Sequence, residues 1–155
     1  MIRNVYALFA LLVALWLGPV GSSRAEDGYA LWMRYPPLPT ARREQLQGWL
    51  GSILAPQSPS APTRAAIDEL QRGLSGMLGR PVPLSKTLQS GTLLLGTPET
   101  LARIGQLDLP LDRLGPEGFI IRSIDVDDRA AIVIAANNDI ALLYGAFALL
   151  RLLQN

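Results

Sequence analysis

Alternating and continuous apolar segments predict a set of short strands. Tyr29, Leu31, Met33 and Tyr35 alternate with other residues, which is typical of a strand with one mostly apolar face. Four more apolar segments predict strands at residues 52–55, 92–95, 118–124 and 130–135. The last two flank the acidic run Asp125–Arg129, so we expect them to form a hairpin with that run as its loop.

Apolar residues spaced three and four apart predict helices between these strands. Thr40 is a candidate cap for a helix over residues 41–49, and the run Pro56–Pro62 has the composition of a loop. A longer amphipathic helix is expected from Thr63 to about Gly79. Thr97 followed by Pro98 and Glu99 predicts the start of another helix, which ends near Leu107.

The last predicted helix, from Ile140 to about Leu153 after the capping run Asn137–Asp139, has almost no polar residues. A helix that is hydrophobic all round is normally buried on all sides, but one sheet can cover only one of its faces. We therefore expect a partner surface, either the rest of a longer polypeptide or a second subunit, with Tyr144, Phe147 and Arg151 as candidate contacts. A lone charge such as Arg151 is then either paired at the edge of that contact or simply turned to solvent.

Residues 1–25 have the three parts of a secretory signal peptide. Arg3 provides the positive start, Val5–Leu17 the apolar run, and Ser23–Ala25 a small-x-small cleavage site. Thirteen apolar residues are too few for a membrane-spanning helix, which needs about 20. The expected product is one domain, residues 26–155, that is secreted or periplasmic and has no membrane segment after cleavage; an uncleaved anchor is the alternative.

Composition removes several kinds of chemistry. The 155 residues include no Cys and no His, so a disulfide framework, a thiolate nucleophile, a Ser-His-Asp triad and the usual zinc sites are excluded. Without Arg3 and Arg24, the 14 basic residues fall to 12 against 13 acidic residues, a net charge of −1. This balance argues against nucleic acid as a partner, because nucleic-acid binding needs a basic excess.

Three features suggest chemistry, and each has a plainer interpretation. Asp125, Asp127 and Asp128 could supply a glycosidase carboxylate pair or a Ca²⁺ site, but aspartates are also favoured in solvated turns. The aromatic residues Tyr29, Trp32, Tyr35 and Trp49 suggest a sugar platform, although core packing is favoured because Trp32 points to the opposite strand face from Tyr29 and Tyr35. The regular spacing of the glycines at 73, 76 and 79 is similar to that of a glycine-rich phosphate-binding loop. Their place within a helix pattern favours close helix packing instead. We therefore assign no catalytic, cofactor-binding or metal-binding residue.

Several segments in a fixed order resemble one known family. They are Glu26–Tyr35, Arg72–Arg80, Gly96–Pro98, Glu117–Arg122, Ile134–Asp139, Leu143–Phe147 and Leu150–Gln154. Together they resemble the N-terminal domain of the xylan-processing α-glucuronidases, glycoside hydrolase family 67. Ala141 and Ala148 depart from the family pattern, which affects only details of helix packing.

The resemblance implies an α+β domain with a mixed sheet and helices on its faces, similar to the domain that precedes the barrel in β-hexosaminidases. It also implies that catalysis, the release of 4-O-methylglucuronic acid from xylo-oligosaccharides, belongs to a following barrel that this chain lacks. That barrel, on the same polypeptide, is the implied partner, and no cofactor is implied. The alternatives are a free-standing carbohydrate-binding or interaction module, and a small enzyme that uses the aspartates near residue 127.

Overall fold

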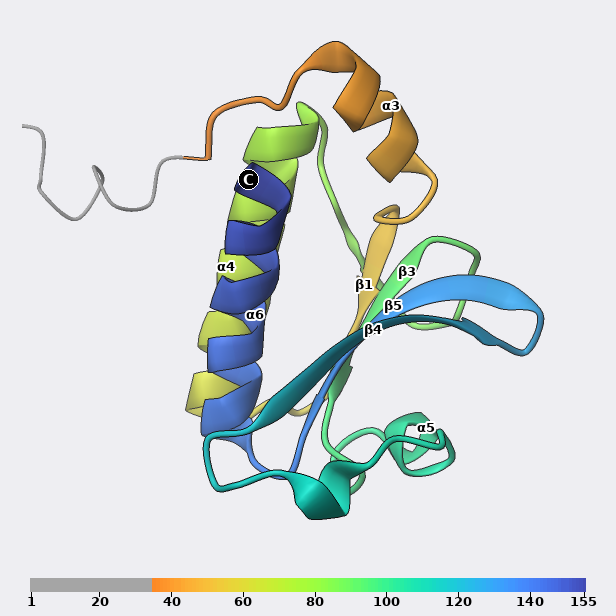
Figure 1. Ribbon diagram of the computed structural model, residues 1–155, viewed down its shortest axis with the longest axis vertical. Coiled ribbons are helices and arrows are strands. Elements are labelled where there is room, and N and C mark those ends of the chain that lie inside the picture. The colour runs from red at the N-terminus through yellow and green to blue at the C-terminus, as the bar shows by residue number, and fades with distance from the viewer. Residues whose placement is uncertain (1–34) are drawn as a thin grey trace, which may run out of the picture. The chain divides into compact units, whose positions relative to one another are not determined.

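The computed structural model describes residues 35–155, which contain one mixed five-stranded sheet in the order β2-β1-β3-β5-β4 (Figure 1). The parallel strands are β1 (Ser52–Leu54), β2 (Leu84–Ser85), β3 (Thr92–Gly96) and β5 (Arg129–Ala136). The edge strand β4 (Phe119–Val126) runs antiparallel to β5. The expected α+β fold with a mixed sheet is confirmed. The expected strand over Tyr29–Tyr35 falls, apart from Tyr35, outside the described residues.

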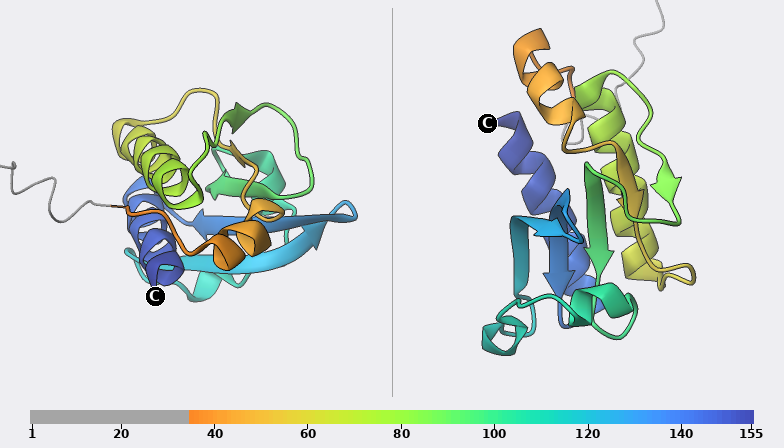
Figure 2. Two further views of the ribbon diagram at one scale, coloured as in Figure 1. Left: turned by 90° about the horizontal axis from the view of Figure 1, so that it is seen from above. Right: turned by 90° about the vertical axis from the view of Figure 1, so that its right-hand side faces the viewer.

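Two helices cover one face of this sheet. Helices α4 (Ala61–Leu78) and α6 (Asp139–Gln154) lie side by side, as the end-on view of Figure 2 shows. Between them and the sheet is the larger hydrophobic core, to which alternate strand residues such as Leu93, Leu95 and Ile134 contribute. Both helices have a side-chain cap, because Ser60 accepts a hydrogen bond from the Thr63 amide and Asn138 accepts one from the Ala141 amide.

The opposite sheet face has a smaller core. It is covered by α5 (Ala102–Gly105) and a 3-10 turn at Leu111–Arg113, through the buried side chains of Ile104 and Leu111. The strand residues that face this core, including Leu94 and Val133, alternate with those that face α4 and α6. This two-sided burial explains why β3 consists almost entirely of apolar residues.

The hairpin between β4 and β5 is tighter than predicted. The strands pair from Phe119 opposite Ala136 to Val126 opposite Arg129, so only Asp127 and Asp128 form the turn. Both residues have positive φ, 51° and 59°, as a two-residue type I′ turn requires. The predicted five-residue loop was therefore wrong, because the twist of the strands favours a two-residue turn and draws Asp125 and Arg129 into the ladder.

Three helix predictions need correction. Helix α3 (Thr40–Gln47) has Pro39 at its cap and no side-chain cap bond, so Thr40 is its first residue rather than its cap. Helix α4 begins at Ala61, because Ser60 caps it and proline is tolerated in a first turn. The helix expected over residues 98–107 shrinks to α5, because residues 98–100 form a turn in which the Thr97 hydroxyl accepts from the Thr100 amide. The short strand β2 was not predicted.

Candidate functional site

The three aspartates of the hairpin are divided between a strand and its turn. Asp125 lies within β4 opposite Ala130, whereas Asp127 and Asp128 form the turn. The Asp127 carboxylate pairs with the Arg103 guanidinium, and its carbonyl accepts a hydrogen bond from Arg129. Throughout residues 35–155, no three Asp, Glu, His or Cys side chains are grouped so that they could hold a metal ion. The turn interpretation is thus confirmed for Asp127 and Asp128.

The glycines of α4 serve packing and helix termination. A Cβ at Gly73 would lie 2.6 Å from Leu150 of α6, and one at Gly76 would lie 2.7 Å from the backbone carbonyl of Tyr35. The prediction of close helix packing is confirmed at Gly73, whereas Gly76 packs closely against the segment before α3. Gly79 differs, because its φ of 67° places it in the left-handed conformation that ends α4.

Of the four aromatic residues of the candidate sugar platform, the structure describes Tyr35 and Trp49. The Tyr35 hydroxyl donates a hydrogen bond to the buried Glu69 carboxylate, so this ring belongs to the packing around α4. Trp49 is 41% exposed on the segment that follows α3. Tyr29 and Trp32 lie outside the described residues.

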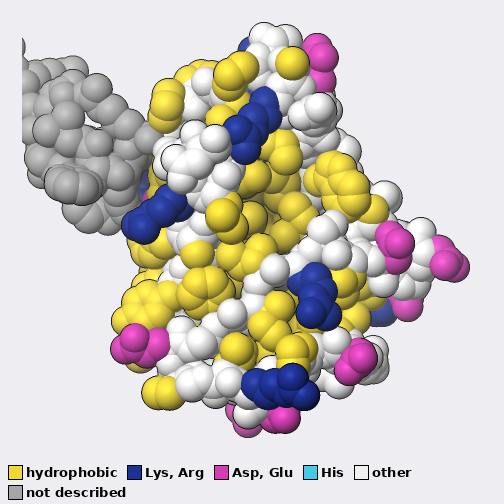
Figure 3. Space-filling view, in the orientation of Figure 1, with side chains coloured by type: hydrophobic (Ala, Val, Ile, Leu, Met, Phe, Trp, Pro, Cys, Tyr) yellow, Lys and Arg dark blue, Asp and Glu magenta, His cyan; other side chains and the backbone are white. Residues whose placement is uncertain are grey.

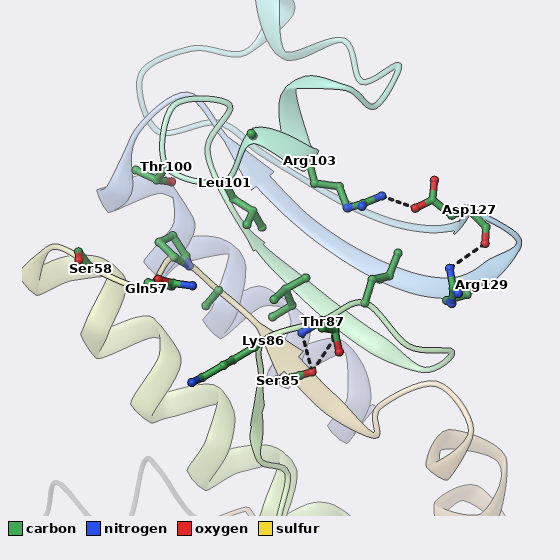
Figure 4. A pocket seen from close by; sticks show the side chains of 15 residues that line it. Gln57, Ser58, Ser85, Lys86, Thr87, Thr100, Leu101, Arg103, Asp127 and Arg129 are labelled. Carbon is green, nitrogen blue, oxygen red and sulfur yellow. Dashed lines mark hydrogen bonds and ion pairs between the residues drawn. The ribbon is translucent and has the colours of Figure 1, made fainter.

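A depression of about 780 Å³ opens beside α5 (Figure 4). Its apolar part comes from Leu54, Leu88 and Leu101, and its rim carries hydroxyl, amide and basic side chains. Those labelled in Figure 4 are Gln57, Ser58, Ser85, Lys86, Thr87, Thr100, Arg103 and Arg129, together with Asp127. The Asp127 side chain is engaged by Arg103, and Lys86 extends away from this pair. The depression therefore offers polar groups, but Asp127 is the only carboxylate within residues 35–155 that lines it. Sequence reasoning missed this site, because its lining comes from four separate segments.

The outer side of α6 is exposed and apolar. Its inner side is buried through Leu142, Gly145, Ala146, Leu149 and Leu150. Of the six large hydrophobic side chains that are exposed within residues 35–155, four lie on α6: Ile140 at 53%, Tyr144 at 41%, Phe147 at 38% and Leu152 at 61%. Figure 3 shows hydrophobic side chains gathered over this helix. The structure thus places the predicted contacts Tyr144, Phe147 and Arg151 on one open helix face, together with Ile140.

The described helices include none that is both long and apolar enough to cross a membrane. Although α6 is the most apolar helix, it has 16 residues, and its inner side is covered by α4 and the sheet.

Comparison with known proteins gives one consistent result. The sequence model described as "Glycosyl hydrolase family 67 N-terminus" matches residues 31–149. A protein of Aspergillus oryzae named "Probable alpha-glucuronidase A" is 29% identical over 145 residues, which are 92% of this chain and 17% of that protein. "Alpha-glucuronidase A" of Emericella nidulans is 31% identical over 149 residues, 92% of this chain and 16% of that protein.

The chain therefore spans about a sixth of the length of these relatives. The matched family model describes their N-terminal region. From this match we conclude that the chain belongs to glycosyl hydrolase family 67 and corresponds to its N-terminal domain.

Proposed function

We propose that this chain is the non-catalytic N-terminal domain of an exported α-glucuronidase. The observation that carries the proposal is the coverage of the match, which takes in 92% of this chain but only 16% to 17% of each relative. In this proposal the whole enzyme releases 4-O-methylglucuronic acid from xylo-oligosaccharides. Its catalytic carboxylates lie in a barrel that follows this domain on the same polypeptide.

The geometry of the described residues supports a structural role for the domain. Inverting glycosidases need two carboxyl groups about 6.5–9.5 Å apart on either side of a sugar. Within the described residues, the depression beside α5 is lined by a single carboxylate, Asp127, which is paired with Arg103, so it does not supply such a pair. The proposal therefore predicts that residues 26–155 release no uronic acid from aldouronic acids, whereas the whole enzyme does.

Export is part of the same proposal, and it rests on the sequence of residues 1–25. The expected mature protein begins at Glu26 and is secreted or periplasmic. N-terminal sequencing of the protein from its source cells tests this directly. A first residue at Met1 in a membrane fraction would support the uncleaved anchor instead.

The intact mass of the native protein is the deciding experiment. An antibody raised against residues 35–155 would capture the protein from its source cells for mass spectrometry. We expect a mass about six times the 16.8 kDa of this chain, in line with the relatives. A mass just below 16.8 kDa would overturn the proposal.

A free-standing carbohydrate-binding module is the second candidate, and the depression beside α5 is the observation that favours it. Its volume lies within the range of about 300–1,000 Å³ that is usual for ligand sites, and its rim of hydroxyl and basic groups suits an acidic sugar. Calorimetric titration of residues 26–155 with glucuronoxylan fragments tests this candidate. The binding module would be favoured over the enzyme domain by two results together: binding of the fragments that Arg129→Ala abolishes, and a small native mass.

A further inference from the structure

The outer face of α6 is a continuous stripe rather than a scatter of exposed residues. Ile140, Tyr144, Phe147 and Arg151 are spaced by four, three and four, so they stack along one side of the helix. Leu152 is the most exposed apolar side chain of the helix, but it lies about 100° around the helix from Arg151 and so beside this row. We call Ile140, Tyr144, Phe147 and Arg151 the α6 stripe.

The stripe has the composition of a protein interface. Its centre combines two aromatic residues with one arginine, and these residue types are enriched at the energetically important positions of interfaces. No residue of the described part of the chain forms a hydrogen bond or ion pair with the Arg151 guanidinium. The positive charge of Arg151, beside apolar side chains, would be complemented by a partner surface that has a carboxylate opposite Arg151.

We propose that the α6 stripe is the surface on which the catalytic part of the same polypeptide packs. This inference rests on the proposed function. The family match ends at residue 149, within α6, and about five-sixths of each relative lies outside the matched part. In such a protein the polypeptide that follows α6 begins beside the stripe. Because the following domain is covalently linked to α6, its effective concentration at the stripe is high.

Tyr144 and Trp49 provide a matched pair for the test, because both are large aromatic residues that are 41% exposed and only Tyr144 lies on the stripe. Tyr144→Asp is introduced into residues 26–155 and, separately, into the full-length native polypeptide. In the short chain it should leave the melting temperature unchanged and reduce the binding of an apolar dye. In the full-length protein it should lower the melting temperature by several degrees, because the buried interface receives an unpaired charge. Trp49→Asp should change the melting temperature by the same amount in the short chain and in the full-length protein.

Charge reversal tests the role of Arg151. Arg151→Glu should lower the melting temperature of the full-length protein clearly more than that of the short chain, because in the full-length protein the facing carboxylate would meet a like charge, whereas in the short chain only the charge at the end of α6 changes. Arg64→Glu, at an exposed position on α4, is the control and should change the melting temperature of both proteins by the same small amount. Equal melting temperatures for Arg151→Glu and Arg64→Glu in the full-length protein would overturn the proposed pairing.

Photo-crosslinking identifies the occupant. A benzophenone amino acid at position 144 of the full-length protein should crosslink to residues beyond 155 of the same polypeptide. Crosslinks to a second copy of this domain, or none at all, would overturn the docking proposal even where the intact mass supports the enzyme. A native mass near 16.8 kDa would instead overturn the proposed function, and the docking proposal with it.

Discussion

Leu150 of α6 lies directly over Gly73 of α4. A Cβ added at Gly73 would come within 2.6 Å and 2.9 Å of the two methyl carbons of Leu150, which is closer than side-chain atoms pack. Leu150 is itself buried in the larger core, so its side chain has little room to move. The absence of a side chain at Gly73 therefore sets how closely the two helices approach.

Gly73→Ala should lower the free energy of unfolding by about 1 kcal/mol. Overpacking against Leu150 costs about 1–3 kcal/mol, and the better helix propensity of alanine returns about 1 kcal/mol. Urea denaturation of residues 26–155 measures the change. A double-mutant cycle with Leu150→Ala then isolates the contact, because Gly73→Ala should become neutral or stabilising once the methyl groups are removed. If the two substitutions changed the free energy of unfolding additively, the proposed contact between positions 73 and 150 would be contradicted.

Ser60→Ala should destabilise the domain by about 1 kcal/mol, because the Ser60 hydroxyl accepts a hydrogen bond from the free Thr63 amide in the first turn of α4. Thr40→Ala is the matched control. Its effect should be small, because the Thr40 hydroxyl accepts an exposed hydrogen bond from Arg43 Nη2 and makes no side-chain cap bond to a backbone amide. Equal losses for the two variants in thermal denaturation would argue against the assigned caps.

Asp128→Gly should raise the free energy of unfolding by about 0.5–1 kcal/mol. Asp128 has a φ of 59°, and residues other than glycine are strained by about 1–2 kcal/mol in the left-handed region. Part of this gain is lost to the greater freedom of glycine in the unfolded chain. Asp125→Gly, within the ladder of β4, should have the opposite sign. Stability changes of the same sign at both positions would contradict the two-residue turn.

Tyr35→Phe should lower the free energy of unfolding by about 1–3 kcal/mol, because it removes a hydrogen bond to the buried Glu69 carboxylate. Arg72 also contacts that carboxylate, so the group keeps one partner. Tyr144→Phe is the control, since Tyr144 is exposed and makes no hydrogen bond with the described residues. In the short chain, Tyr35→Phe should therefore unfold at a lower denaturant concentration than Tyr144→Phe.

Much of the secondary structure could be predicted from local sequence. Strands β1 and β3 and helix α6 appear where apolar runs and the caps at residues 137–139 place them. These elements are set by side-chain spacing and by hydrogen bonds between near neighbours. Errors arose where local signals competed, as at Thr40, where Pro39 takes the cap position, and at residues 98–100, where a threonine turn replaces the start of a helix.

The candidate sites depended on tertiary structure to a greater degree. Sequence alone indicated that α6 is apolar on every side, and it marked Tyr144, Phe147 and Arg151. It did not show which side the sheet and α4 would bury, so Ile140 and Leu152 were missed. The depression beside α5 was not predictable at all, because its lining residues are brought together only when the strands pair and the hairpin turn meets α5.

The sequence by itself determined the absence of thiol and imidazole chemistry, the near-neutral charge, most of the elements and the family resemblance. These properties follow from residue identity and from spacings of a few residues. Only the tertiary structure decided that Asp125 stands apart from the turn and that Gly73 accommodates Leu150. It also decided which side of α6 stays open. The physical reason is that burial is a property of the whole packed chain, and no local pattern shows which of two apolar faces the core will cover.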